Sequence, residues 1–199
     1  MVVKTLGKSI LAVIVITIIC GIYTLIVSAI GQTFFTSQAN GSLVRSDQTV
    51  RGSALIAQPF TSKKYLWGRQ MNITVGDITG QKNNKNIMYS MASQMSPNDK
   101  SYQKEIIDKE KTIKRLNPNA TYRHVPIDLV TNSGSGLDPE ISPTAAKYQV
   151  KRIAKARHVS VQKIQRVINQ NTKTRTLGIL GEPRVNVLET NLALDKLSK

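Results

Sequence analysis

The sequence contains very few of the residues from which disulfides and metal sites are made. Its single cysteine, Cys20, lies inside a long apolar run, and its two histidines, His124 and His158, are far apart. The chain outside this run has no cysteine and therefore no disulfide, which is unusual for a small domain outside the cell. A domain that docks on a larger partner needs no such cross-link. The same shortage argues against a zinc site, because zinc ligands come in closely spaced groups.

Motifs that mark common enzymes are also missing. The sequence has no G-x-x-x-x-G-K-[ST] phosphate loop, no G-x-S-x-G nucleophile turn and no H-E-x-x-H metal motif. Asp128, Asp138 and Glu140 lie close together in the sequence, and paired carboxylates can act as acid and base. We expect Asp138, which precedes a proline, to form a turn, and Asp128 to accept structural hydrogen bonds.

Acidic residues are scarce relative to basic ones. There are 12 of them against 28 lysines and arginines, so the formal net charge is +16. Lys4 and Lys8 precede the apolar run, which leaves +14 for the chain that follows it. Such a charge attracts nucleic acid, anionic lipid or an acidic partner surface. We expect a basic protein beside the negative membrane surface, and no nucleic-acid partner.

What the sequence does have is an uncharged run of 23 residues from Ser9 to Gly31. As an α-helix this run would be about 34 Å long, and the hydrocarbon core of a bilayer is about 30 Å thick. A cleaved signal peptide is the alternative, and Ser37-Gln38-Ala39 loosely resembles a cleavage site. The apolar region of a signal peptide is only about 7–15 residues long, however. The run therefore predicts a transmembrane helix over residues 9–31.

The charges beside the run predict its orientation. Lys4 and Lys8 lie before it, and no charge follows until Arg45. Because basic residues near a span stay on the cytoplasmic side, residues 1–8 should be cytoplasmic and the chain after the span exported. We predict a single-pass protein of the cell (plasma) membrane with a connector over residues 32–51. Residues 52–199 should form one extracytoplasmic domain.

Within this domain, helix and strand signals alternate. Serine followed by proline begins one helix at Ser96-Pro97, which runs to Leu116, and another at Ser142-Pro143, with Gln149 at the edge of its apolar face. The other expected elements are strands over residues 52–58, 125–131 and 185–187, a surface loop over 74–86, a helix from Ser160 to Asn169 with Val161, Ile164, Val167 and Ile168 inward, and a turn over 178–183. This order favours a membrane-anchored α/β (α+β) fold, with one transmembrane helix and one mixed soluble domain.

One pair of helices also resembles a helix-turn-helix. Residues 145–156 and 160–169 are joined by a short turn, and the second helix carries Lys163 and Arg166. Amphipathic helix pairs are common in ordinary cores, and an exported domain never meets DNA. We therefore interpret the pair as part of the core.

Four stretches in the C-terminal part of the chain are DLVTNSGSGLDPEISP at residues 128–143, QVKRIAKAR at 149–157, GILGEPRVNV at 178–187 and NLALD at 191–195. Together and in this order they resemble KdpC, the C subunit of the Kdp potassium-transporting ATPase. GSALI at 52–56, the single N-terminal span and a length near 200 also fit. The sequence departs from the family at Gln70-Met71, where the family continues with proline and serine. It also departs at the glycine-rich loop, here residues 79–84, and at Glu140, where the family often has histidine.

The resemblance implies a non-catalytic subunit of an ATP-driven complex that imports potassium with high affinity. Its partners would be a pore-forming subunit that binds potassium and a P-type pump subunit. The chain lacks the pump's Asp-Lys-Thr-Gly motif. It would stabilise the assembly and act as a catalytic chaperone that raises the pump's affinity for ATP. No cofactor would be bound tightly, although ATP could be reached through the pump.

The resemblance also marks two sets of residues. Gln149 matches a glutamine proposed to contact nucleotide, and the family loop is formed by Ser133, Gly134, Ser135, Gly136, Leu137, Asp138 and Pro139. Direct contact with ATP conflicts with an exported domain, because ATP is cytoplasmic. The alternative is a membrane-tethered regulator that binds nucleotide or nucleic acid and has a cytoplasmic domain.

Overall fold

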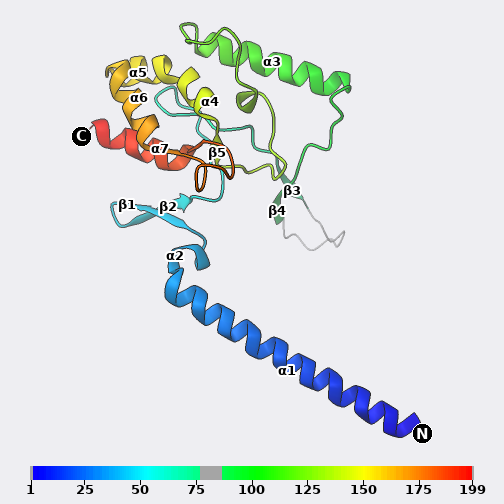
Figure 1. Cartoon of the computed structure of the whole chain (residues 1–199). Coiled ribbons are helices and arrows are strands. Elements are labelled where there is room, and N and C mark those ends of the chain that lie inside the picture. The colour runs from blue at the N-terminus through cyan, green and yellow to red at the C-terminus, as the bar shows by residue number, and fades with distance from the viewer. Residues whose placement is uncertain (1, 77–86, 199) are drawn as a thin grey trace. The chain divides into compact units, whose positions relative to one another are not determined.

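The computed structural model describes residues 2–76 and 87–198. The chain divides into two compact units, Met1–Leu43 and Val44–Lys199. Figure 1 shows one long helix followed by a mixed unit of helices and short strands, which confirms the predicted fold class.

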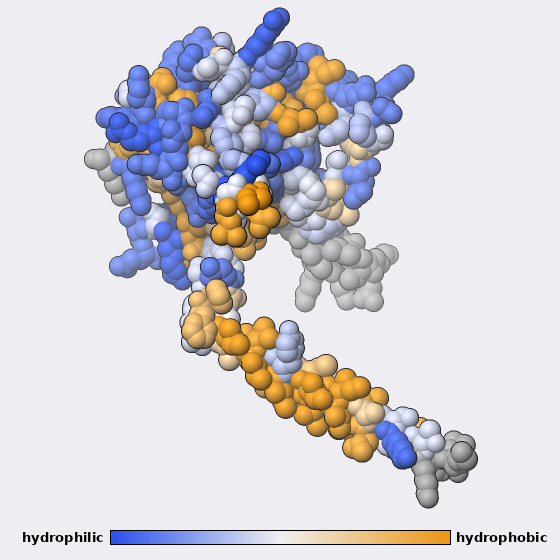
Figure 2. All heavy atoms as spheres, in the orientation of Figure 1, coloured by the Kyte–Doolittle hydropathy of each residue, from blue (hydrophilic) through white to orange (hydrophobic). Residues whose placement is uncertain are grey.

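The N-terminal unit consists mainly of helix α1 (Val2–Phe34), followed by the single turn α2 (Thr36–Ala39). The predicted helix over residues 9–31 is present and extends beyond this range at both ends. The face of its middle part seen in Figure 2 is largely apolar, and exposed apolar residues occupy consecutive positions such as 13–16, so they lie on every side of that part. Its threonines donate their hydroxyls back to the carbonyl four residues earlier, as Thr17 and Thr24 do. Within the described chain, Thr5–Phe34 is the one helix long and apolar enough to cross a membrane.

The C-terminal unit contains more helix than strand. Its elements are β1 (Leu43–Ser46), which begins at the boundary, β2 (Thr49–Ser53), β3 (Ile73–Gly76), β4 (Ile87–Ser90), α3 (Lys100–Leu116), η1 (Ile127–Leu129), β5 (Glu140–Ile141), α4 (Pro143–Tyr148), α5 (Val150–Arg157), α6 (Val161–Gln170), β6 (Thr172–Lys173), β7 (Arg184–Asn186), α7 (Val187–Asp195) and η2 (Lys196–Ser198). β1 pairs with β2 and β3 with β4, while β5, β7 and β6 form a three-stranded antiparallel sheet.

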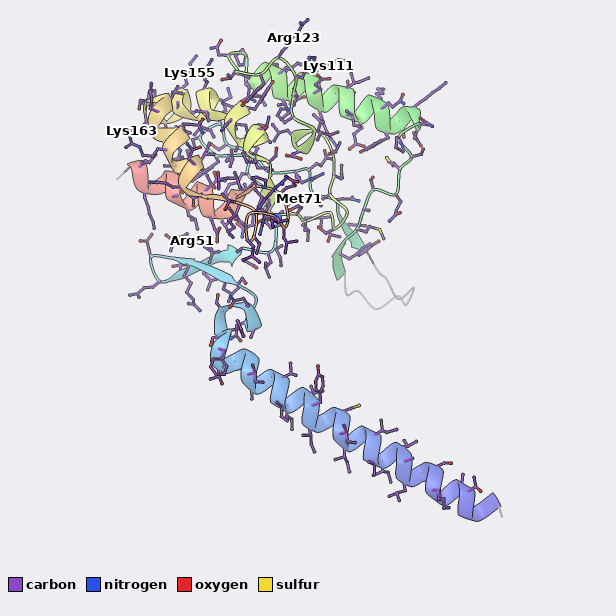
Figure 3. All side chains as sticks on the ribbon, viewed as in Figure 1. Arg51, Met71, Lys111, Arg123, Lys155 and Lys163 are labelled. Atoms are coloured by element: carbon purple, nitrogen blue, oxygen red, sulfur yellow. The ribbon has the colours of Figure 1, made fainter. Side chains whose placement is uncertain are left out.

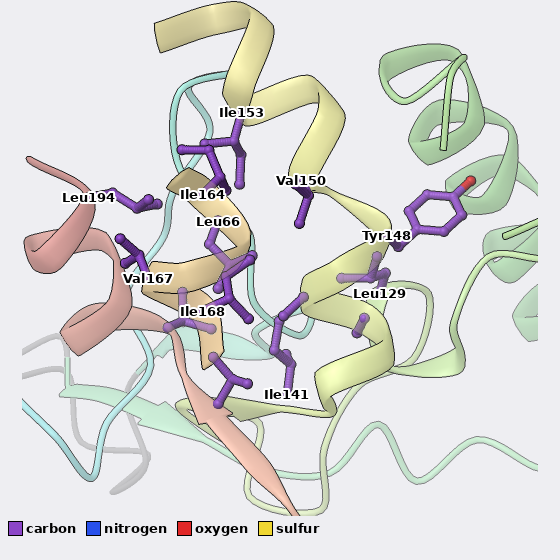
Figure 4. Packing of buried hydrophobic residues seen from close by; sticks show 14 of the residues in the cluster. Leu66, Leu129, Ile141, Tyr148, Val150, Ile153, Ile164, Val167, Ile168 and Leu194 are labelled. Carbon is purple, nitrogen blue, oxygen red and sulfur yellow. The ribbon is translucent and has the colours of Figure 1, made fainter. Parts of the chain in front are cut away.

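The hydrophobic core lies between the sheet β5-β7-β6 and helices α4 to α7 (Figure 4). Ile153, Ile164 and Ile168 come from α5 and α6, and each is fully buried. Leu66 enters the same core from a segment without regular secondary structure. Burying side chains of this size contributes about 2–3 kcal/mol each. The core is mostly aliphatic, in line with the scarcity of aromatic residues, although Tyr148 is also buried in it.

Helices with local capping signals form where the sequence predicts them. Ser142 and Ser160 accept hydrogen bonds from the backbone of Ala145 and Lys163, and so cap α4 and α6. On α6, Ile164, Val167 and Ile168 are buried as expected, whereas Val161 is exposed, so its predicted inward position is wrong. The helix predicted after Pro143 is interrupted at Gln149, which separates α4 from α5.

Four other local predictions need correction. Helix α3 begins at Lys100 and not at Ser96, because Asp99 accepts the backbone N–H groups of Ser101 and Tyr102. The strand predicted over residues 52–58 ends at Ser53, whose hydroxyl accepts the Leu55 N–H, and Leu55 and Ile56 are exposed. Of the loop predicted over residues 74–86, residues 74–76 belong to β3, which pairs with β4. Residues 77–86, which include the divergent 79–84 segment, lie outside the described residues.

The strand predicted over residues 125–131 is instead the 3₁₀ turn η1. Pro126 has no N–H to donate to a sheet, and its carbonyl accepts from Leu129. Leu129 and Val130 are consecutive and both buried, so the segment lacks the alternation of a strand. At the other end of the domain, the turn around Gly178 and strand β7 confirm the predicted turn and strand.

Replacing Gly136 with alanine should destabilise the C-terminal unit by about 2–4 kcal/mol. Gly136 has a φ of +74°, and an added Cβ would lie 2.7 Å from the Met91 carbonyl and 2.9 Å from that of Asn72. Gly134→Ala is the matched control, because its Cβ would meet nothing within 4 Å. Urea unfolding of the solubilised full chain, followed by fluorescence of the single tryptophan, would measure both. Equal stability of the two variants would contradict the prediction.

Candidate functional site

The family loop, residues 133–139, is a structural junction. Its hydroxyls are used inside the loop, since Ser133 Oγ accepts the Asp138 N–H and Ser135 Oγ accepts that of Leu137. Its carbonyls accept hydrogen bonds from three distant parts of the chain: Gly136 O from Asn72 N, Leu137 O from Ala57 N and Pro139 O from Val187 N. The loop therefore joins residues 57 and 72 to the start of α7.

The carboxylates beside this loop surround an arginine. The Arg69 guanidinium lies 3.8 Å from Asp128 and 3.7 Å from Asp138, and it donates to Thr131 Oγ1 and Asn132 O. Asp138 also accepts the Glu140 N–H, and Asp128 accepts the Ser142 N–H. Both expected structural roles are confirmed. Glu140 points to a different partner, Arg184, at 2.9 Å.

Gln149 lies at the junction of α4 and α5 with 1% of its surface exposed. Its Oε1 accepts the Trp67 N–H at 2.9 Å and a guanidinium N–H of Arg152 at 2.6 Å. Its Nε2 donates to the carbonyls of Trp67 and Ala145, at 3.0 and 3.2 Å. The side-chain amide therefore uses its two donors and two acceptor positions within the protein. The predicted nucleotide contact stays a prediction.

A second buried amide bonds both backbone polar groups of Leu66, as Gln149 bonds both of Trp67. Asn191, on α7, accepts the Leu66 N–H at 2.7 Å and donates to the Leu66 carbonyl at 2.9 Å. Sequence reasoning missed this residue. The motif NLALD contains it, but nothing local distinguishes it from an ordinary helix asparagine, because its partner lies 125 positions away.

Two arginines of α5 also donate hydrogen bonds to backbone carbonyls of residues 63–67. Arg152 donates to Lys63 O, Asn117 Oδ1 and Gln149 Oε1, and its guanidinium lies 4.7 Å from the centre of the Trp67 ring. Arg157 donates to Lys64 O, Leu194 O and Asp195. We refer to Gln149, Arg152, Arg157 and Asn191 as the clamp.

Arg152 is a buried cation whose bonded partners are neutral oxygens. Burial lowers the pKa of Arg152 from its ordinary value to about 10. The guanidinium therefore remains charged at neutral pH. Its contact with the Trp67 ring and its three hydrogen bonds offset part of the cost of removing that charge from water.

Arg152 also lines a basic pocket of about 370 Å³ between α5 and the end of α3. The basic residues of this pocket are Lys63, Arg115, Lys151, Arg152 and Lys155. Among the described residues that line it there is no carboxylate. Figure 3 shows Lys155 projecting from α5 at the surface. Such a pocket is suited to an oxyanion such as phosphate or carboxylate.

A larger groove of about 630 Å³ lies between α3 and residues 58–71. Its lining has charges of both signs, including Arg69, Glu105 and Lys109, so the groove does not favour ligands of one charge. The divergent residues Gln70 and Met71 line it, and Gln70 Nε2 donates to Glu105. Across the described residues, no group of three or more histidines, cysteines or acids is placed to hold a metal ion.

The helices that resemble a helix-turn-helix pack together through buried residues such as Ile153 and Ile164. His158, with a φ of +55°, makes the tight turn between them. Lys163 and Arg166 are exposed, and Figure 3 shows Lys163 at the surface. The expectation of no nucleic-acid partner stays a prediction.

The fold and these clusters together describe a protein with one apolar N-terminal helix and a C-terminal unit whose polar side chains hold its own backbone. A family model described as KdpC, K⁺-transporting ATPase c chain, matches residues 6–196. The chain belongs to the KdpC family.

Curated relatives agree over nearly the whole chain. A potassium-transporting ATPase KdpC subunit from Clostridium perfringens is 48% identical, with 96% of this chain and 97% of the relative covered. One from Clostridium botulinum strain Alaska E43 is 42% identical, with 96% of each covered. One from Klebsiella pneumoniae is 42% identical, with 89% and 88% covered.

Gln149→Ala should destabilise the C-terminal unit by about 2–4 kcal/mol, because it leaves the Trp67 amide, the Trp67 carbonyl and Arg152 with fewer partners. Gln162→Ala is the control: this glutamine is exposed on α6, and its loss should change stability by less than about 0.5 kcal/mol. Urea unfolding of the full chain would give both values. A Gln149 variant as stable as the control would contradict the role described for the clamp.

Proposed function

We propose that the chain is a non-catalytic accessory subunit of an ATP-driven complex that imports potassium with high affinity, and that it stabilises this assembly. The observation that carries the proposal is the family match over residues 6–196, together with relatives named as potassium-transporting ATPase KdpC subunits. Its partners would be a pore-forming, potassium-binding subunit and a P-type pump subunit.

The chemistry of the described residues supports a structural role. Side chains that could act on a substrate, such as Ser133 and Gln149, are bonded to the protein's own backbone. The carboxylates of Asp128 and Asp138 lie against Arg69. An acid or base for catalysis needs a titratable group that can reach a substrate, and these groups are already engaged.

The affinity-tagged chain should co-purify from membranes with two larger membrane proteins, because a stabilising subunit is bound to the subunits that it supports. Mass spectrometry of the mild-detergent eluate would identify them. Isolation of the chain as a stable monomer under the same conditions would contradict the proposal.

The basic pocket supports a second candidate function, in which the domain binds nucleotide and raises the pump's affinity for ATP as a catalytic chaperone. Lys63, Lys151 and Lys155 would face the phosphates. Gln149 would then act through Arg152, to which it is bonded at 2.6 Å. This function requires a cytoplasmic domain, as does a membrane-tethered regulator of any other kind.

The side of the membrane on which the C-terminal domain lies distinguishes the stabilising subunit from the nucleotide-binding candidate. With Lys4 and Lys8 before the span, the proposed topology has a cytoplasmic N-terminus and an exported domain. A phosphatase fused to the C-terminus should therefore be active, and a fluorescent reporter that matures only in the cytoplasm should be dark. The opposite pair of results would favour the nucleotide-binding candidate and overturn the exported topology.

A further inference from the structure

The loop between β6 and β7 presents a concentrated apolar surface. Leu177 is 87% exposed, Ile179 77% and Leu180 59%, and these three residues lie within four positions of one another. In Figure 1 this is the orange loop that precedes α7, and Figure 2 shows a hydrophobic patch on that part of the surface. Single exposed apolar residues are ordinary, but a contiguous exposed group marks an interaction site.

The loop is held in one conformation by its own bonds. Thr176 and Leu180 exchange both backbone hydrogen bonds, at 2.8 and 2.9 Å, and Gly178 N–H donates to the Arg175 carbonyl. Leu177 has a φ of +54°, a conformation that a leucine adopts only when its surroundings impose it. At the base of the loop, Arg175 and Glu182 form an ion pair at 2.6 Å.

A rigid loop of this kind is suited to docking. The hydrogen bonds within the loop already order its backbone, so little backbone entropy remains to be lost on binding. The glycine at 178 allows the turn, because its φ is +75° and its surroundings are open. Because the Leu177 side chain is 87% exposed, it contributes nothing to the packing of the core.

The charges around the loop are balanced, although the unit as a whole is strongly basic. Lys173 pairs with Glu189 at 3.5 Å, Arg175 with Glu182, and Arg184 with Glu140 at 2.9 Å. A loop that inserts into the surface of a bilayer carries basic residues that face anionic lipid. The paired charges here favour instead an uncharged protein surface.

We propose that Leu177, Ile179 and Leu180 dock into an apolar, uncharged depression on one of the larger membrane subunits of the transport complex. This inference rests on the proposed function and adds the surface by which the chain binds its partner. A few well-packed residues near the centre of an interface carry most of its affinity, while the contacts around them exclude water.

Two changes to the full chain, expressed with its complex, test the docking loop. In the first, Leu177→Asn is combined with Ile179→Ser, because asparagine tolerates a positive φ and so preserves the turn. We expect the co-purified amount of the larger subunits to fall about tenfold. The control is Ile127→Ser, which removes a 70% exposed isoleucine from η1 and should leave co-purification unchanged. Tryptophan fluorescence during urea unfolding should show both variants folded.

In the second change, a photo-reactive amino acid replaces Ile179, and the expected product is an adduct with a larger subunit. An adduct formed only with lipid or with a second copy of this chain would overturn the inference. So would a double variant that retains the larger subunits. If the unaltered chain itself purifies without them, the proposed function fails; if it retains them and the loop variants do so too, only the docking loop fails.

Discussion

The backbone of residues 63–67 imposes the main constraint on the C-terminal unit. This segment carries Leu66 into the core without belonging to a sheet, so its N–H and C=O groups need other partners. The clamp supplies them: Gln149 bonds both polar groups of Trp67, Asn191 bonds both of Leu66, and the two arginines bond the carbonyls of Lys63 and Lys64. Because the clamp comes from the α4–α5 junction, α5 and α7, one irregular segment fixes these helices relative to one another.

Much of the local structure follows from the sequence, because its causes are local. The Ser142 and Ser160 caps, the end of α3 at Leu116 and the turn around Gly178 each depend on a few neighbouring residues. Strands were predicted less well, since residues 125–131 became a turn and residues 52–58 left the sheet at Ser53. Strands this short are decided by distant partners rather than by their own alternation.

The candidate site illustrates the same limit. Resemblance to the family indicated Gln149, and the helical pattern placed it at the edge of an apolar face, but neither indicated the backbone that its amide binds. Its actual partner, Trp67, lies 82 positions away. Arg152 and Asn191 lie in motifs that resemble the family, but nothing in the sequence marked their buried contacts, since a buried arginine with neutral partners looks in sequence like any basic residue of an amphipathic helix. The partners of the family loop are also distant in the sequence, because its carbonyls accept hydrogen bonds from the backbone of residues 57, 72 and 187.

Charge is distributed unevenly over the C-terminal unit. Around the docking loop the basic residues are paired with acids, whereas the basic pocket beside α5 brings five cations together. An exported domain of charge +14 would repel potassium if its basic surface faced the entrance of a pore. Docking through the neutral apolar loop, as proposed, would avoid this conflict, because it would place the uncharged surface against the partner and leave the basic pocket free for an anion. Such a division would allow a strongly basic domain to serve a complex that must admit a cation.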